Sequence, residues 1–544
     1  EATDIDNHEP IRIINNSIKF DDPSQGCIAI RIVQQNRAIL IQNCSFYQCS
    51  KVYNQKETYE NCLSFNSMKK VEINECQFYQ CGVCSDNGCP SPSGGGNVIV
   101  IQPNVEECII NKCRIEFTNE HQGGSGISTY TDNILIEENE FIKCYENTIL
   151  IQCKTEGENE LRIIRGSSEG PIISFWTNSY LTKTPIIKDN TFKDITVLQD
   201  NEIGINIQVD QDITEIEFNN NTFDNYEIQL KNIGINIVRK AGGTTNPIKV
   251  KHTDSKFINM KQKRRDESNI EEIQFEFERC LFEGNEGRYY GGSLYINNNK
   301  QTIIQECQFI SNFATQRKGG TSNLPGEGGC IYINQGEVHI SGSNFTNNHC
   351  GKGEAIYINN NQGILIIDEN CQFKNNFDIN QINTKQYSIQ SNSEHLSITN
   401  TEFITSIDNQ AETTYEYQCG FIYLTNSGKI EIQTCKFNNH NFRSSILYDI
   451  EETTDDNQMT IESCEFNECL TDVININLQA NSKETFNINN CKFERCTGRD
   501  DGPSNTIEIS RQTKNIRLSI ENNIFHNCGK LKDNNYVMKI ELEA

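Results

Sequence analysis

The sequence predicts an all-β fold, a right-handed parallel β-helix solenoid of about 17–18 coils. One short phrase returns along the whole 544-residue chain, mostly at intervals of 25–37 residues. Within the phrase apolar residues alternate with polar ones, which is typical of a strand that buries one face. A repeat of this length points to a solenoid, because each unit buries its core only against its neighbours.

The recurring phrase is apolar-x-apolar, two further residues, Cys or Asn, one residue and then Phe. Clear copies are ILIQNCSF (39–46), VEINECQF (71–78) and TIIQECQF (302–309). We expect each Phe to stack on the Phe of the next coil, so that the rings form an interior column. The 51-residue gap before Phe192 has room for an extra turn through Ile163. The column residues are Phe20, Phe46, Phe78, Ile115, Phe141, Phe192, Phe223, Phe257, Phe282, Phe309, Phe345, Phe373, Phe403, Phe437, Phe466, Phe493 and Phe525.

A second phrase, rich in Gly and apolar residues, lies about halfway between consecutive Phe residues. It appears as GGSLYI (291–296), GGCIYI (328–333) and GEAIYI (353–358). Asn-, Gly- and Asp-rich segments separate the two phrases, as turns do. Each coil should therefore hold two or three short strands, and 1–544 should form a single continuous β-helix. We expect loop insertions near 82–97, 258–272 and 311–328.

The position two residues before each Phe is expected to face the interior at a turn. It is Cys in nine coils and Asn, Ser or Thr in seven. A small polar side chain there can satisfy neighbouring backbone groups, and Cys fills the same space as a small hydrophobe. The residues of this inward ladder are Ile18, Cys44, Cys76, Cys113, Asn139, Asn190, Asn221, Ser255, Cys280, Cys307, Ser343, Cys371, Thr401, Cys435, Cys464, Cys491 and Asn523.

The Gly phrases resemble a known family when they are taken together with FEGN (282–285), FISN (309–312) and FKNN (373–376). They are similar to the GGAI and FxxN repeats of bacterial polymorphic membrane proteins, which also occur in protist surface proteins with a pectin-lyase-like β-helix. The resemblance is clearest from about 280 to 440. It implies a secreted or surface-displayed rod used in adhesion or envelope structure. The Asn-, Ile-, Lys- and Gln-rich composition suggests a protist source.

Several of the 24 Cys lie five residues apart around a Phe. Five residues span a turn, so this spacing favours a disulfide within one coil. A bridge between adjacent coils, such as Cys496 to Cys528, is equally allowed, and an unbridged ladder of thiols is the plain alternative. A loop-tying bridge from Cys84 to Cys89 is favoured over a zinc site, which would need four ligands. The disulfide candidates are Cys44, Cys49, Cys76, Cys81, Cys84, Cys89, Cys108, Cys113, Cys464, Cys469, Cys491 and Cys496.

The charge of the chain and the length of its apolar runs argue against a nucleic-acid partner and against a membrane-spanning helix. The 74 Asp and Glu outnumber the 48 Lys and Arg, which gives a net charge of −26. Nucleic-acid binding needs clustered basic residues, so no nucleic-acid partner is expected. No apolar run approaches the length of a membrane-spanning helix, so no transmembrane segment is expected. The one basic cluster is read as a solvated loop, with docking on another copy as the alternative; it comprises Lys261, Lys263, Arg264 and Arg265.

No catalytic, cofactor-binding or metal site is predicted. A polysaccharide lyase or hydrolase needs clustered carboxylates with calcium, or two carboxylates flanking the glycosidic bond. No cofactor is expected, and calcium is the one that the lyase chemistry would bring in. The acidic candidates are interpreted as surface ion pairs or turn residues, and they are Asp210, Asp212, Glu215, Asp455, Asp456, Asp500 and Asp501.

We expect an extracellular or cell-surface location. The Cys content favours an oxidising compartment, and a chain that starts at Glu1 fits removal of a signal peptide. Four Asn-x-Ser/Thr sequons are candidates for glycosylation in a secreted chain. They are Asn15, Asn43, Asn220 and Asn344.

The leading hypothesis is a non-enzymatic extracellular β-helix rod with a structural or adhesive role. The chain begins as a coil at 11–20 and stops on YVMKIELEA (536–544), which has the pattern of a further strand. Open coils favour end-to-end self-association, including a head-to-tail filament. The alternative is a polysaccharide-binding or polysaccharide-degrading protein, a lyase or hydrolase. A carbohydrate or cell-surface partner is compatible with both hypotheses.

Overall fold

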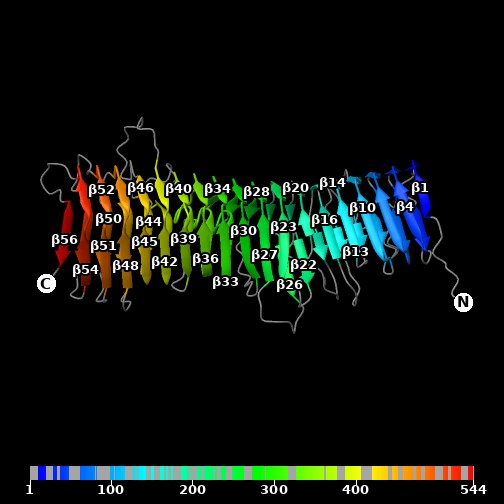
Figure 1. Cartoon of the computed structure of the whole chain (residues 1–544). Coiled ribbons are helices and arrows are strands. Elements are labelled where there is room, and N and C mark those ends of the chain that lie inside the picture. Colours follow the sequence, from blue (N-terminus) through cyan, green and yellow to red (C-terminus); the bar gives the residue numbers. More distant parts are fainter. Residues whose placement is uncertain are drawn as a thin grey trace, which may run out of the picture. The chain divides into compact units, whose positions relative to one another are not determined.

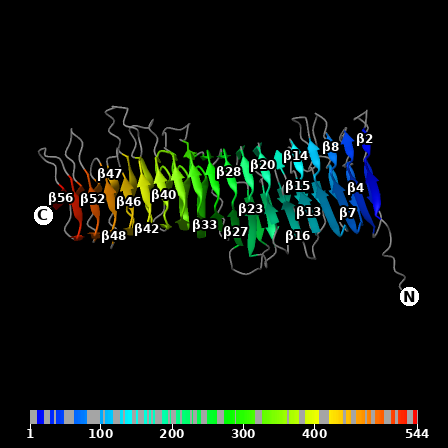
Figure 2. The same cartoon turned by 45° about the horizontal axis from the view of Figure 1, so that its top comes forward.

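The computed structural model consists of strands and the turns beside them. Its described residues form two compact units, unit 1 over Glu1–Lys256 and unit 2 over Phe257–Ala544. Within each unit parallel strands stack turn upon turn and the described residues form no helix, which confirms the predicted all-β parallel solenoid (Figures 1 and 2). The described residues are 10–19, 29–33, 37–47, 49, 62–79, 81, 98–102, 105–116, 127–129, 133–142, 149–151, 160–164, 167–169, 173–175, 186–193, 196–197, 205–209, 214–224, 227–228, 235–239, 248–262, 273–287, 289–315, 326–359, 363–376, 386–405, 419–438, 444–450, 457–469, 473–478, 484–496, 506–511, 516–528 and 537–542.

Each turn of unit 1 contributes strands to three rows, and neighbours within a row pair in parallel. The long row, which opens the recurring phrase, holds β1 (Ile11–Ile14), β4 (Ala38–Gln42), β7 (Lys70–Asn74), β10 (Glu107–Asn111), β13 (Asn133–Glu137), β16 (Glu160–Ile164), β19 (Ile186–Lys188), β23 (Glu215–Asn219) and β27 (Ile248–Thr253). The Phe row holds β2 (Ser17–Lys19), β5 (Ser45–Tyr47), β8 (Gln77–Tyr79), β11 (Arg114–Glu116), β14 (Glu140–Ile142), β17 (Ser167–Glu169), β20 (Thr191–Lys193) and β24 (Thr222–Asp224). The third row holds β3 (Ile30–Val33), β6 (Leu63–Asn66), β9 (Ile99–Ile101), β12 (Ile127–Thr129), β15 (Ile149–Ile151), β18 (Ile173–Phe175), β22 (Ile205–Val209) and β26 (Ile235–Arg239), and β21 (Thr196–Val197) pairs with β25 (Glu227–Ile228).

Unit 2 has the same three rows. Its long row holds β30 (Ile273–Glu278), β33 (Leu294–Gln305), β36 (Ile331–Ser341), β39 (Ile364–Asp368), β42 (His395–Thr399), β45 (Lys429–Gln433), β48 (Asn457–Glu462), β51 (Glu484–Asn489) and β54 (Ile516–Glu521). Its Phe row begins at β28 (Lys256–Ile258). The row continues with β31 (Leu281–Glu283), β34 (Gln308–Ile310), β37 (Asn344–Thr346), β40 (Gln372–Lys374), β43 (Glu402–Ile404), β46 (Lys436–Asn438), β49 (Glu465–Asn467), β52 (Lys492–Glu494) and β55 (Ile524–His526). The third row holds β38 (Ile356–Ile358), β41 (Gln386–Ser391), β44 (Cys419–Thr425), β47 (Ser444–Ile450), β50 (Ile474–Leu478), β53 (Ile507–Arg511) and β56 (Met538–Leu542), and the short strands are β29 (Lys261–Gln262), β32 (Glu286–Gly287) and β35 (Phe313–Ala314).

Strands extend into two of the predicted insertions. Strand β29 lies inside the segment 258–272, and β35 lies inside 311–328. The third, 82–97, lies outside the described residues.

A left-handed residue marks the turn from the long row to the Phe row. Asn43, Glu75 and Arg279 have φ between 51° and 54°, and the same turn position recurs along both units. The N–H of such a residue donates to a carbonyl of the next turn, as from Asn43 to Asn74 at 3.0 Å. The residue that follows then faces the interior. Asn tolerates this backbone region better than most residues, which explains part of the Asn content.

The predicted column of Phe rings is confirmed. In unit 2 the ten rings from Phe257 to Phe525 stack with neighbouring centroids 4.6–5.0 Å apart. In unit 1 Phe46 stacks on Phe78 at 4.9 Å, and Ile115 takes the same position one turn later. Most of these rings are fully buried, so the column forms the centre of each unit's core.

The turn that begins the described chain has a different register from the one predicted. Ile18 pairs with Phe46 and takes the column position, whereas the sequence placed Phe20 there and Ile18 in the ladder. The structural reason is the left-handed turn residue, which is Asn15 here and Asn43 in the next turn. The predicted extra turn through Ile163 is confirmed. It is formed by β16 and β17, and Ser168 stands opposite Phe141 and Phe192.

Candidate functional site

Two ladders of inward side chains flank the Phe row, one at each end of its strands. The first ladder is the predicted one, two residues before the column position. The second stands three residues after it, where FISN and its relatives carry Asn. In the described residues the second ladder includes Cys49 and Cys81 in unit 1 and Asn285, Asn312, Asn348, Asn376, Cys469, Cys496 and Cys528 in unit 2.

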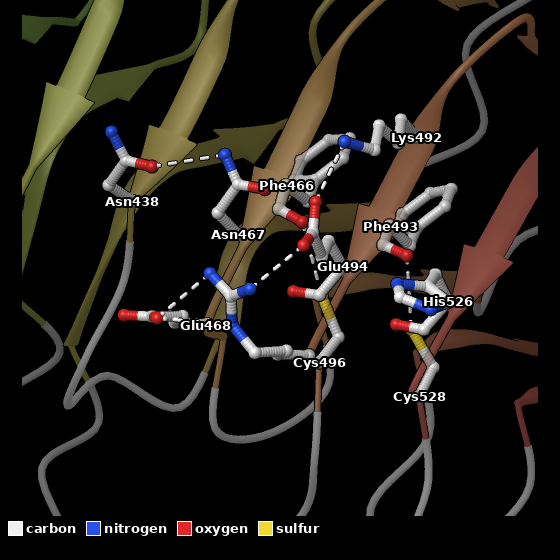
Figure 3. A network of polar contacts seen from close by, with 11 residues as sticks. Asn438, Phe466, Asn467, Glu468, Lys492, Phe493, Glu494, Cys496, His526 and Cys528 are labelled. Atoms are coloured by element: carbon white, nitrogen blue, oxygen red, sulfur yellow. Dashed lines mark hydrogen bonds and ion pairs between the residues drawn. The ribbon is translucent and has the colours of Figure 1, made fainter.

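Asn and Cys make the same contact in the second ladder. Asn312 Nδ2 donates to the carbonyl of Phe282, the column residue one turn earlier, at 3.0 Å. Cys496 Sγ donates to the carbonyl of Phe466 at 3.4 Å, and Cys528 Sγ donates to that of Phe493 at 3.3 Å (Figure 3). The two residue types are thus alternative ways of satisfying one buried backbone carbonyl per turn.

The first ladder repeats this chemistry on the long row. Cys113 Sγ donates to the carbonyl of Ile73 at 3.5 Å, and Asn139 Nδ2 donates to that of Ile110 at 2.8 Å. Asn adds a bond that Cys makes poorly, because its Oδ1 also accepts from the N–H of Cys113 at 2.8 Å. The predicted role of this position as a satisfied inward ladder is confirmed.

Burial keeps most ladder thiols protonated. Loss of solvent raises the pKa of Cys371 to about 12, and it raises the pKa of Cys113 and Cys307 well above the ordinary value. A buried, protonated thiol is a weak nucleophile. These cysteines therefore fill and hydrogen-bond the core, and their environment does not activate them.

The within-coil disulfides predicted from the five-residue spacing are not formed. All cysteines whose side chains are described carry free thiols, among them Cys44, Cys49, Cys464 and Cys469. The two members of such a pair belong to different ladders at opposite ends of a three-residue strand. That strand alone spans about 10 Å, beyond the separation a disulfide tolerates. Cys76 with Cys81 and Cys491 with Cys496 are separated in the same way, and Cys108 lies within β10, before Cys113.

One group of thiols departs from the ladder arrangement. The Sγ atoms of Cys49, Cys62 and Cys81 lie within 4.8 Å of one another, and all three residues are buried. Cys49 and Cys81 are neighbours in the second ladder, but Cys62 enters from the start of β6 in the third row. The sequence did not identify Cys62, because it lies outside both repeating phrases. The two candidates Cys84 and Cys89 lie outside the described residues.

The contacts among these three thiols shift their pKa values in opposite directions. Donation from Cys62 and Cys81 lowers the pKa of the Cys49 thiol to about 4. Burial raises the pKa of Cys62, and it raises that of Cys81 as well.

The acidic candidates and the basic cluster fall mostly outside the described residues. Of the seven carboxylates only Glu215 is described, at the start of β23 opposite Lys249. Of the basic cluster only the backbone of Lys261 is described, in β29. The surface that is described carries ion pairs of the expected kind. In one network the guanidinium nitrogens of Arg495 lie 2.8–3.1 Å from carboxylate oxygens of Glu468 and Glu494. Figure 3 shows where these two carboxylates lie.

The four sequon residues are all exposed. Asn344 lies on β37 with its side chain outward, as its place beside the column residue predicted. Asn43 Nδ2 donates to Asn15 Oδ1 at 2.7 Å, and Asn220 Nδ2 donates to Asp189 Oδ1 at 2.8 Å. The amides of Asn15, Asn43 and Asn220 thus take part in side-chain hydrogen bonds, and Asn344 is the sequon residue best placed for glycosylation.

Comparisons of the chain with family models, curated proteins and solved structures gave no match. Within the described parts of the chain, no helix has the length and apolar character needed to cross a membrane.

Proposed function

We propose that the chain is a non-enzymatic structural or adhesive β-solenoid displayed outside the cell. One observation supports this most: the interior of each unit repeats the same contacts from turn to turn. In unit 2 ten successive aromatic rings stack in one column, and each ladder residue satisfies the turn before it. Such repetition gives a stiff scaffold whose outward residues and connecting segments are free to carry recognition.

The surface role draws its support from the phrases themselves. GGCIYI and the FxxN copies resemble those of polymorphic membrane proteins and pectin-lyase-like surface proteins. The Gly of the phrase has a packing reason in this chain, since a Cβ on Gly329 would lie 1.9 Å from the carbonyl of Glu354. The Asn of FxxN has the hydrogen-bonding reason given above. We therefore propose that the resemblance reflects a shared way of building turns.

Self-association of the solenoid belongs to the same proposal. In the described residues β56 pairs with β53 on one side. Ile524 is 61% exposed and Ile540 is 40% exposed at this edge of unit 2. A parallel strand from a second copy would pair with the edge and cover these apolar side chains.

Electron microscopy of the purified chain over a range of concentrations tests self-association. We expect end-to-end assemblies, and we expect Ile524→Lys with Ile540→Lys to abolish them. The matched control is Asn344→Lys, which places the same charge on an exposed strand position away from the edge. Single particles at every concentration, or assemblies that the edge variant leaves intact, would overturn this part of the proposal.

A panel of acidic and neutral polysaccharides, with and without calcium, tests the non-enzymatic role. The proposal expects no release of unsaturated or reducing sugars in any condition. Release of such sugars would establish the polysaccharide-degrading alternative. Binding to one polysaccharide without cleavage is compatible with an adhesive solenoid and would name its partner.

The extracellular location has its own test in the sequons. Mass spectrometry of peptides from the native protein should find N-linked glycan on exposed Asn344. Unmodified Asn344 peptides at full recovery would contradict passage through a secretory pathway that glycosylates Asn.

A further inference from the structure

We propose that Cys49, Cys62 and Cys81 form a three-sulfur site for a soft cation, Cu(I). The first reason is geometric. Their Sγ atoms lie within 4.8 Å of one another. Three sulfurs bound in a plane at about 2.3 Å from one metal ion are about 4.0 Å apart, so small shifts would bring them to that arrangement.

The three-sided arrangement distinguishes this cluster from the ladders. A ladder thiol has neighbours one turn above and one turn below, as Cys76 has in Cys44 and Cys113. The outer two of such a row are separated by two strand spacings, about 9.6 Å, and cannot share an ion. In unit 1 a third thiol lies beside two ladder neighbours. Cys62, just before β6, places its Sγ within 4.8 Å of the Sγ atoms of both Cys49 and Cys81, so the three sulfurs form a triangle.

The donor set favours Cu(I) over zinc. Structural zinc is four-coordinate, and among the described residues no further His, Cys, Asp or Glu joins the three thiols. Thiolate sulfur selects soft ions, and Cu(I) is stable with two or three such ligands. Oxygen-seeking ions such as calcium find no ligand in the group.

The surroundings also suit a soft ion. Cys49 and Cys62 are 0% exposed and Cys81 is 1% exposed. The strands that carry the site contribute Phe46, Leu63, Phe65 and Phe78, which are at most 1% exposed. Binding needs no change in the oxidation state of Cu(I). Each thiol that becomes a ligand releases its proton to the solvent, so uptake should weaken as the pH falls.

Retention of Cu(I) against a competing chelator tests the proposal on the reduced full-length chain under anaerobic conditions. The chelator is bathocuproine disulfonate, whose coloured complex reports the copper that the protein gives up. We expect the wild type to retain about one Cu(I) more per chain than Cys62→Ser. The matched control is Cys113→Ser, a buried ladder thiol of the same unit, which should retain as much as the wild type.

Two measurements on the unaltered chain keep the test valid if Cys62→Ser fails to fold. X-ray absorption at one equivalent of Cu(I) should show three sulfur ligands. Peptide mapping without reduction should find all three cysteines unbridged. The proposal is overturned by equal retention in the wild type and a folded Cys62→Ser chain, by a two-coordinate spectrum, or by preferential retention of zinc when both ions are offered. A disulfide within the trio would overturn it as well.

Discussion

At the residue scale, the stability of this chain depends on side chains that repeat their contacts. Phe345 shows the rule, because it is 0% exposed and stacks on Phe309 at 4.7 Å and on Phe373 at 4.6 Å. Parallel rings at this separation are offset stacks, which add to the free energy of simple burial. A single ring therefore supports two neighbouring turns.

Removal of one ring should destabilise unit 2 strongly. We expect Phe345→Ala to lower the free energy of unfolding by about 3–5 kcal/mol, because it opens a cavity between two rings that cannot close it. Urea denaturation followed by circular dichroism measures the change. Asn344→Ala on the same strand, at an exposed position, is the control and should be near neutral. Equal effects of the two substitutions would contradict the interior column.

His252 gives unit 1 a predictable response to acid. It is 1% exposed, it stacks on Phe218 at 4.7 Å, and burial lowers its pKa to about 3. The unfolded chain binds a proton at this residue below about pH 6.5, and the folded chain does not until about pH 3. Stability is therefore lost as the pH falls between these values, by up to about 1.4 kcal/mol per pH unit.

Substitution of His252 should remove this acid sensitivity. We expect His252→Phe to keep the stack on Phe218 and to lose about 2.3 kcal/mol less than the wild type between pH 6.5 and pH 4.5. Urea titrations at the two pH values give the difference, in which the effect of the many carboxylates cancels. Parallel pH profiles of the two proteins would show that His252 is protonated in the folded chain.

The sequence predicted the residues that repeat and missed those that do not. Phe at a fixed offset from Cys or Asn defined the column and the first ladder, because both recur often enough to stand out. Cys62 recurs nowhere, so only the folded chain could bring it to Cys49 and Cys81. The five-residue spacing of the cysteines was a true regularity with another cause: it reflects two ladders on either side of one strand.

At the scale of the element, the turn before the Phe row is the most demanding piece of backbone. Thr434 illustrates its cost, since it is β-branched and holds φ at 55°. Its counterpart one turn earlier is Asn400, whose amide donates to Asn370 Oδ1 at 2.9 Å. A β-branched residue in this region is strained by roughly 1 kcal/mol or more.

Replacement of Thr434 by Asn should stabilise the chain. We expect Thr434→Asn to raise the free energy of unfolding by about 1 kcal/mol, because Asn tolerates this backbone and can extend the row of amides from Asn400. Thr460→Asn, within strand β48, is the matched control and should give no gain, since Thr suits a strand better than Asn. A gain of equal size at both positions would remove strain as the cause.

The second ladder should accept Cys for Asn but reject an apolar residue of similar size. Asn312 accepts from the N–H of Asn285 at 3.1 Å and donates to the carbonyl of Phe282 at 3.0 Å. Asn312→Leu leaves both groups unpaired and should cost about 2–5 kcal/mol. Asn312→Cys keeps a donor for the carbonyl, as Cys496 does, and should cost less than half as much in the same urea titration. Equal costs would refute the equivalence of the two residue types.

Strands and their alternation were predictable, but register at the start was not. The phrase IRIINNSIKF holds two apolar residues, Ile18 and Phe20, at the spacing of a strand face, and Phe matched the other coils. The structure chooses Ile18, because the left-handed turn falls at Asn15. Turn geometry therefore set the register where apolar pattern alone left two choices.

At the scale of the whole molecule, the contacts give two units, each a parallel solenoid. Free buried thiols also change the meaning of the 24 Cys. The ladders explain most of the described ones without an oxidising compartment, so the proposal of an extracellular location now depends on the sequons and on the resemblance of the phrases. The charge of −26 fits a solenoid that exposes one face of every strand, since the alternate residues of each strand are free to be polar.

The most direct test of the solenoid is a series of distances along one row of unit 2. Exposed Gln308 lies in register with Asn344, and the same pairing continues through Lys436 and Lys492 to Ile524. Spin labels carried by non-natural amino acids avoid the native thiols, and electron paramagnetic resonance measures their separation. With one label at Gln308, stacking at about 4.8 Å per turn predicts about 19 Å to Lys436 and about 34 Å to Ile524. Distances that fail to grow with the number of turns would contradict the account.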